Sequence, residues 1–292
     1  MMQDIEHLVI IGTGLIGGSV ALALRKAGVA KRITGVGRRL ENLQLAVKLG
    51  VIDDYSLDIG AAVTQADMVL VSVPVAASAS VFQAMAATLP ANAVVTDAGS
   101  SKQSVMAAAN QYLPNPNRFV PAHPIAGTEE SGAAAAFSEL FEAHWCILTP
   151  DLHTDAEALE RVHALWTVTG SKVIEMDAAT HDEQLAAVSH LPHMAAFALV
   201  NAVRKSGGAD PFQFAAGGFR DFTRIASSSP EMWRDIALCN RPALTLKLDA
   251  LITELGVLRR AVDGGDTDLL LKEFSQARKA RDSWLLKHGD AL

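Results

Sequence analysis

The sequence has few cysteines, few aromatic residues and no excess of positive charge. Its 292 residues include two cysteines, Cys146 and Cys239, which lie far apart along the chain. Two isolated thiols exclude a disulfide scaffold or a metal-binding knuckle, and they are typical of a reducing compartment. The formal net charge of −7 argues against a nucleic-acid-binding surface, which needs basic residues to neutralise phosphates. Aromatic residues make up only 5%, whereas alanine and glycine are plentiful, which favours close packing of helices against a sheet.

Long uninterrupted hydrophobic segments are also missing. Residues 68–96 contain no charge, but Pro74 and Pro90 interrupt them. A buried strand–helix–strand unit therefore explains this segment better than a membrane span does. Residues 1–7 lack the basic start and the cleavage site of a signal peptide. We expect a cytoplasmic protein with no membrane partner and no nucleic-acid partner.

In the first half of the chain, short apolar runs alternate with longer amphipathic stretches. Strands are predicted at 7–11, 32–36, 68–73 and 93–96, and helices at 15–27 and 41–49. This alternation predicts an α/β fold, a doubly wound parallel sheet with helices on both faces. Further short strands are predicted at 119–122, 145–149 and 172–176.

Beyond residue 177 the pattern is helical throughout. Thr180 and Glu183 have the spacing of a capping box, which predicts a helix that starts there. Leucines between 244 and 258 recur every three or four residues, and a last helix is predicted from about 266 towards 288. Such leucine-rich helices need a partner surface. We therefore expect a dinucleotide-binding domain at 1–177 and an all-α domain at 178–292 that binds substrate and forms a homodimer.

A glycine motif directly follows the first predicted strand and opens the first predicted helix. Gly12 permits a tight turn, Gly14 lets the backbone approach a pyrophosphate, and Gly17 allows helix and strand to lie close together. The free N–H groups at the helix start favour phosphate oxygens. In this setting the motif predicts a Rossmann-type cofactor site, formed by Gly12, Thr13, Gly14, Leu15, Ile16 and Gly17.

The end of the second predicted strand bears on the choice between NAD and NADP. An acidic residue there accepts a hydrogen bond from the adenosine ribose and favours NAD. This chain instead has Arg38 and Arg39. Two guanidiniums and no carboxylate favour NADP, although both arginines could equally be solvated loop residues. Ser72 and Pro74, which end the third predicted strand, are also expected to contact the cofactor.

Four further polar stretches carry the candidate chemistry. They read TDAGSSK at 96–102, HPIAGTE at 123–129, SHLPH at 189–193 and GGFRDFTR at 217–224. The first two follow predicted strands, so they should lie at the carboxyl edge of the sheet, where ligands bind in such folds. With GLIGGS at 14–19 and PEMWRDI at 230–236, the chain resembles the prephenate and arogenate dehydrogenases of tyrosine biosynthesis over almost its whole length.

The resemblance implies the oxidative decarboxylation of a cyclohexadienol, with NAD or NADP as cofactor. It implies that His123 accepts the proton of the ring hydroxyl, that Ser100 orients this hydroxyl and the nicotinamide, and that Arg224 binds a substrate carboxylate. A histidine suits the first role because its ordinary pKa lies near neutrality. The family pattern adds further pocket or supporting residues: His193, His190, Thr128, Glu129, Asp221 and Trp233.

Several alternatives stay open on the sequence alone. His190 and His193 are three residues apart and have no evident third ligand, so we expect no metal site. A β-hydroxy acid or imine-reducing dehydrogenase, with Lys102 as its catalytic residue, is the closest competing enzyme. A non-catalytic dinucleotide sensor is the competing regulator. His193 favours the keto acid prephenate, whereas Glu129 could contact the ammonium group of arogenate.

Overall fold

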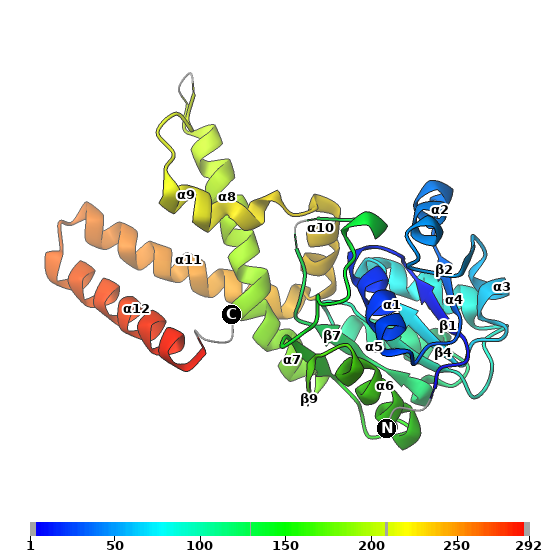
Figure 1. The fold of residues 1–292 in the computed structure, drawn as a ribbon. Coiled ribbons are helices and arrows are strands. Elements are labelled where there is room, and N and C mark those ends of the chain that lie inside the picture. Colours follow the sequence, from blue (N-terminus) through cyan, green and yellow to red (C-terminus); the bar gives the residue numbers. More distant parts are fainter. Residues whose placement is uncertain (1–3, 129, 208–209, 289–292) are drawn as a thin grey trace. The chain divides into compact units, whose positions relative to one another are not determined.

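The computed structural model describes residues 4–128, 130–207 and 210–288. The chain divides into two compact units, Met1–Arg241 and Pro242–Leu292. The first unit holds both sheets and every candidate site residue, and it is shown with the second unit in Figure 1.

A six-stranded parallel sheet forms the centre of the first unit. Its strands are β1 (Leu8–Ile11), β2 (Ile33–Val36), β3 (Asp54–Ser56), β4 (Met68–Val71), β5 (Val94–Asp97) and β6 (Phe119–Val120). They lie in the order β3-β2-β1-β4-β5-β6, which is the order of a doubly wound dinucleotide-binding sheet. The predicted fold class is confirmed. The short edge strand β3 was not predicted, because Asp54-Tyr55-Ser56 lacks the apolar run that marks the inner strands.

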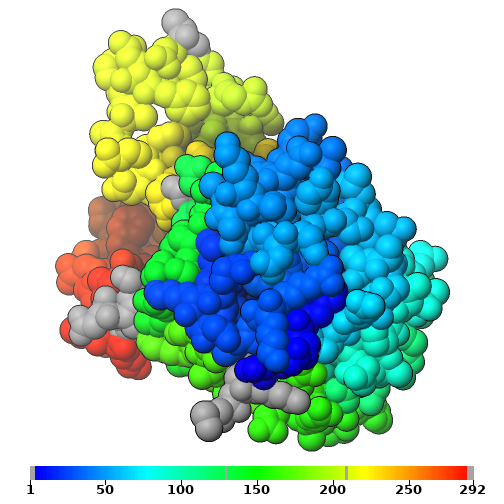
Figure 2. Space-filling model, turned by 45° about the vertical axis from the view of Figure 1, so that its right-hand side comes forward, coloured from blue at the N-terminus to red at the C-terminus, as the bar shows by residue number. Residues whose placement is uncertain are grey.

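Helices cover both faces of this sheet. They are α1 (Leu15–Ala27), α2 (Leu40–Lys48), α3 (Ile59–Val63), α4 (Ser78–Met85), α5 (Gln103–Tyr112) and α6 (Ala156–Val168). Neighbouring residues of β1 point to opposite faces, so Ile10 joins one buried apolar cluster with Trp166, while Val9 joins another with Phe82. In Figure 2 the segments of the first hundred residues, blue to cyan, form one continuous packed surface.

A second, three-stranded sheet carries His123. It consists of β7 (Ala122–Pro124), β8 (Trp145–Leu148) and β9 (Lys172–Glu175), with β7 antiparallel and β9 parallel to β8. The prediction of a single strand at 119–122 is wrong, because the chain passes from the first sheet to the second at Pro121. Proline lacks the N–H group that would continue the ladder, so Pro121 suits this transfer.

The rest of the first unit is helical, as predicted. Its helices are α7 (Ala178–Leu185), α8 (Leu191–Lys205), α9 (Gly217–Thr223) and α10 (Pro230–Cys239). A π-helical turn, η4 (Ala186–His190), joins α7 to α8, and Figure 1 shows the two as one long rod. The predicted capping box is wrong: Asp177 caps α7, and its Oδ1 accepts from the Thr180 N–H at 2.9 Å.

By length and composition alone, the rod at 178–205 is apolar enough to cross a membrane. It nevertheless carries three buried polar side chains, His181, Asp182 and His190. All three hydrogen-bond to other parts of the first unit, so we assign the rod to the folded domain. The second unit takes in α11 (Arg241–Asp263) from its second residue onward, and α12 (Thr267–His288). Gly264 and Gly265 follow the end of α11.

Candidate active site

The glycine turn has the shape that a dinucleotide requires. Gly12 has φ of +102°, and a Cβ atom there would lie 2.1 Å from the Ser72 carbonyl oxygen. A Cβ atom on Gly17 would lie 2.2 Å from the Gly12 carbonyl oxygen, so both positions exclude larger residues. A Cβ atom on Gly14 would meet nothing within 4 Å, which leaves open space beside the turn. Gly14 also gives α1 no side-chain cap, so the N–H groups of the first turn are available to a phosphate.

The other predicted cofactor residues lie along the carboxyl edge of the sheet. Ser72 follows β4, and its N–H donates to the Ile11 carbonyl at 2.8 Å. Pro74 is exposed at the start of a short 3₁₀ turn, η1 (Val75–Ala77). Arg38 and Arg39 follow β2 and are both exposed. Within residues 4–128, 130–207 and 210–288, neither guanidinium forms a salt bridge.

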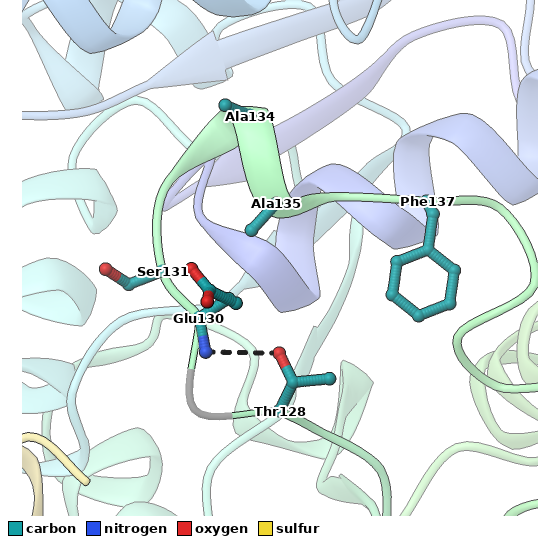
Figure 3. A pocket seen from close by; sticks show the side chains of 6 residues that line it. All are labelled: Thr128, Glu130, Ser131, Ala134, Ala135 and Phe137. Atoms are coloured by element: carbon teal, nitrogen blue, oxygen red, sulfur yellow. Dashed lines mark hydrogen bonds between the residues drawn. The ribbon is translucent and has the colours of Figure 1, made fainter. Parts of the chain in front are cut away.

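An open pocket of about 570 Å³ lies next to the glycine turn. It is lined by Thr128, Glu130, Ser131, Ala134, Ala135 and Phe137, as Figure 3 shows. Asn42, which the sequence analysis did not single out, connects this pocket to the turn. Its Nδ2 atom donates to the backbone oxygen and Oγ1 of Thr13, and its Oδ1 accepts from the Ala133 N–H at 3.3 Å.

A buried ion pair holds the loop that carries Ser100. The Nζ atom of Lys102 lies 2.6 Å from Oδ2 of Asp97, and the two side chains are 0% and 1% exposed. Asp97 also accepts from the Gly99 N–H, as expected for a residue that caps this turn. Lys102 donates in addition to the Ala122 carbonyl at 2.6 Å. All of these groups are buried and paired, so Lys102 is unsuited to the catalytic role it would have in the competing dehydrogenase.

His123 projects from β7, immediately after Ala122. It is buried, and its Nδ1 atom lies 2.8 Å from Nε2 of His181. Burial lowers the pKa of His123 well below its ordinary value, and the neighbouring ionisable groups of His181, Lys102 and His190 lower it further, since each disfavours a second positive charge beside it. His123 is therefore neutral at pH 7, the form that a proton acceptor needs.

Next to His123 lies a second histidine, His181, which the sequence analysis did not single out. His181 is fully buried, and its Nδ1 atom lies 2.9 Å from Oδ1 of Asp182. Asp182 also accepts from the backbone N–H groups of Lys102 and Gln103, at 2.7 and 3.0 Å. Burial opposes its charge, but the hydrogen bonds from His181 and from both N–H groups prevail and lower the pKa of Asp182.

His190 lies in the π-helical turn and is also buried. Asn240, the residue that follows α10, donates through Nδ2 to the Asp182 carbonyl at 2.7 Å and contacts Nδ1 of His190 at 3.1 Å. Burial is the main cause that lowers the pKa of His190 to about 4, and the Asp182 carboxylate acts in the opposite direction. The His190 ring also packs edge-on against Trp233, with ring centres 6.1 Å apart.

His193 and Trp233 form a stacked pair. Their ring centres are 3.5 Å apart with an angle of 21° between the planes, and Trp233 is buried. Burial lowers the pKa of His193, and the positive charge of nearby Arg224 lowers it further. Nδ1 of His193 lies 2.9 Å from the Ser189 carbonyl and must donate to it, so the neutral ring has only an acceptor left at Nε2. In this form His193 has no N–H left to donate to the carboxylate of a keto acid, so it does not favour prephenate in the way expected from the sequence.

The structure thus joins most of the predicted residues through a chain of neighbours. Asp97 and Lys102 of the Ser100 loop bind Ala122, the residue before His123. Trp233 lies edge-on to His190 and stacks on His193, which is close enough to Arg224 to feel its charge. The exposed carboxylate of Asp221 pairs with Arg220 at 3.2 Å. Glu129 lies outside the described residues. Across the described ranges, no three His, Cys, Asp or Glu side chains are arranged to hold a metal ion.

Comparisons with known proteins relate the whole chain to a family of enzymes. Residues 20–175 match the family model for the nucleotide-binding domain of prephenate dehydrogenase, and residues 177–276 match the model for its dimerization domain. The chain is 39% identical to prephenate dehydrogenase of Bacillus subtilis, over all of this chain and 80% of that protein. It is 41% identical to cyclohexadienyl dehydrogenase of Zymomonas mobilis, over 96% of each chain.

A solved structure shows the same fold. Prephenate dehydrogenase from A. aeolicus, in complex with hydroxyphenyl propionate and NAD+, superposes with a TM-score of 0.88 at 36% identity. The match covers 96% of this chain and 99% of that one.

Proposed function

Because the chain belongs to the prephenate dehydrogenase family, we propose that the site around His123 oxidises and decarboxylates prephenate, arogenate or both. The family resemblance of its motifs is confirmed, and the protein is an NAD(P)-dependent dehydrogenase of tyrosine biosynthesis. The observation that carries the site assignment is the buried imidazole of His123 directly after Ala122, which Asp97 and Lys102 of the Ser100 loop hold by hydrogen bonds.

The chain's own residues would act in the following way. Nε2 of His123 takes the proton of the ring hydroxyl, while Ser100 orients that hydroxyl. NAD(P), held at the glycine turn, would supply the acceptor for the hydride that leaves the same carbon. The bond to the ring carboxylate then breaks, its electron pair completes the aromatic ring, and carbon dioxide leaves. Arg224 offers a permanently charged, planar fork to the side-chain carboxylate. His193 and Trp233 wall this end of the site, and Thr128, Glu129 and Asp221 are proposed to support it.

The glycine turn fits the pyrophosphate of a dinucleotide, since Gly14 leaves open space beside free helix N–H groups. We further propose a preference for NADP. Arg38 and Arg39 are exposed after β2, no acidic residue precedes them there, and neither is engaged in a salt bridge among the described residues. Both guanidiniums are therefore available to a 2′-phosphate. Ser72 and Pro74 would line the same edge.

We propose a homodimer formed by a helical domain that starts at residue 178. The match to a dimerization domain from residue 177 supports it. Large apolar side chains on α11 and α12 are also exposed in the single chain: Leu246, Ile252, Leu255, Val262, Leu271 and Phe274. A second copy would remove this surface from water. The prediction of a cytoplasmic location is retained for an enzyme whose relatives act in biosynthesis.

The decisive experiment compares initial rates with prephenate and arogenate, each with NAD and NADP. We expect turnover with at least one pair and a lower KM for NADP than for NAD. In the same assay, His123→Asn should reduce kcat by about 10²- to 10⁴-fold, the range of general base catalysis, with cofactor binding unchanged. Normal turnover by His123→Asn would refute the assignment of the base.

A further inference from the structure

Three side chains form a single hydrogen-bonded line behind the proposed base. The line runs from His123 to His181 at 2.8 Å and from His181 to Asp182 at 2.9 Å. His181 is fully buried and Asp182 is almost so. The two imidazole rings are tilted by 63°, with centres 5.1 Å apart. Neither His181 nor Asp182 has a role in the chemistry proposed above.

Backbone groups fix the direction of the hydrogen bonds along this line. The N–H groups of Lys102 and Gln103 donate to Oδ1 and Oδ2 of Asp182, and a backbone N–H can only donate. Both carboxylate oxygens are therefore acceptors, and Nδ1 of His181 must donate to Asp182. When the His181 ring carries one N–H only, this N–H is used toward Asp182 and Nε2 is left as an acceptor.

The same logic then applies to His123. If Nε2 of His181 accepts, Nδ1 of His123 must donate to it. Nε2 of His123 consequently has a free lone pair, which is what a proton acceptor requires. An ionised carboxylate that orients a catalytic histidine through its second nitrogen is an established arrangement in other enzymes. Here a second histidine stands between the carboxylate and the base.

We propose that His181 and Asp182 are positioning residues that hold His123 in the tautomer with Nδ1 protonated. This inference rests on the proposed role of His123 as the base. Asp182 links two parts of the site, because the backbone groups it binds open α5 directly after the Ser100 loop. One carboxylate thereby fixes both the orientation of His123 and the position of Ser100.

The resting enzyme provides a test that needs no functional variant. Two-bond ¹H–¹⁵N correlations in the protein labelled with ¹⁵N-histidine distinguish the two tautomers of a neutral imidazole. The His123 signals are identified by their loss in His123→Asn. We expect His123 with Nδ1 protonated, and the opposite tautomer would overturn the proposal.

Kinetics of His181 variants provide the second test. His181→Leu removes the acceptor and should lower kcat about 10- to 100-fold, with little change in the KM values for substrate and cofactor. His181→Gln can present an amide oxygen near the position of Nε2, so it should recover at least half of that loss on a logarithmic scale. His153→Leu, which changes an exposed histidine, is the matched control and should behave as wild type.

The outcomes separate this inference from the proposed function. Should His123→Asn abolish turnover while His181→Leu retains wild-type kcat, the positioning role is wrong and the base stands. Should His123→Asn turn over normally, the base assignment is wrong whatever His181 does. If His181→Leu fails to fold, the proposal is tested by kcat of His181→Gln and by the tautomer of His123 in the wild type. A folded His181→Gln variant with no measurable turnover would count against the proposal.

Discussion

Removing the charge of Lys102 should destabilise the first unit strongly. Its ammonium and the Asp97 carboxylate are 2.6 Å apart and buried, so Lys102→Met leaves a carboxylate without its counter-ion in the interior. Breaking such a pair costs about 3–5 kcal/mol. Asp97 keeps the N–H groups of Gly99 and Ala122 at 2.8 and 3.1 Å, which compensate part of the charge. We therefore expect the lower end of the range, about 3 kcal/mol.

Thermal unfolding followed by circular dichroism measures this cost. At about 2–4 °C per kcal/mol for a chain of this size class, Tm should fall by roughly 6–12 °C. Lys48→Met, at an exposed position on α2, is the control and should stay within about 0.5 kcal/mol of wild type. Adding Asp97→Asn to Lys102→Met should cost at least about 1 kcal/mol less than the sum of the single changes. A Lys102→Met protein as stable as the Lys48→Met control would refute the reasoning.

Three further predictions concern activity. Because His123 acts unprotonated and its pKa lies well below 6.5, kcat/KM should fall only as the pH drops below 6.5; a half-maximal point above pH 6.5 would contradict the burial argument. Arg38→Ala should raise KM for NADP about tenfold, the value of one charge-assisted hydrogen bond, and leave KM for NAD within about twofold; equal effects on both would mean that Arg38 contacts no phosphate. Gly12→Ala should lower Tm, because its Cβ would meet the Ser72 carbonyl, whereas Gly14→Ala should keep Tm and weaken cofactor binding, as measured by fluorescence titration. Equal losses of Tm in both glycine variants would argue against the described turn.

The centre of the sheet was predictable because β1, β2, β4 and β5 are short, mainly apolar runs, each of which leads into a glycine or a polar loop. The carboxyl ends of β1 and β5 therefore placed the glycine turn and the Ser100 loop on one edge from the sequence alone. The predictions were wrong where two nearby residues carry similar signals. Asp177 and Thr180 both suit a helix cap, and Asp177 prevails because its carboxylate accepts from the Thr180 N–H. Pro121 lies within an apolar run, so the run was assigned to one strand. The missing N–H of Pro121 does not reveal that the residues before it join one sheet and the residues after it join another.

Long-range polar contacts were the part of the site that the sequence did not reveal. His181 and Asp182 lie 58 and 80 residues from their partners His123 and Lys102, and no spacing pattern connects such positions. The one local signal was an adjacent His-Asp pair at the start of a helix that carries His190. Asn42 is similar, because its contact with Ala133 spans 91 residues. Pairings at this separation depend on how the sheets and helices stack.

The wide turn at Ala186–His190 has a consequence for the direction in which α8 presents its side chains. An extra residue in a helical turn rotates everything after it by about 100° relative to a regular α-helix. Pro192, which has no N–H to donate to the preceding turn, favours such a widening. The angular setting of His193 against Trp233 is thus determined by the length of one turn, so deletion of a single residue there would swing that imidazole away from the indole without altering either side chain.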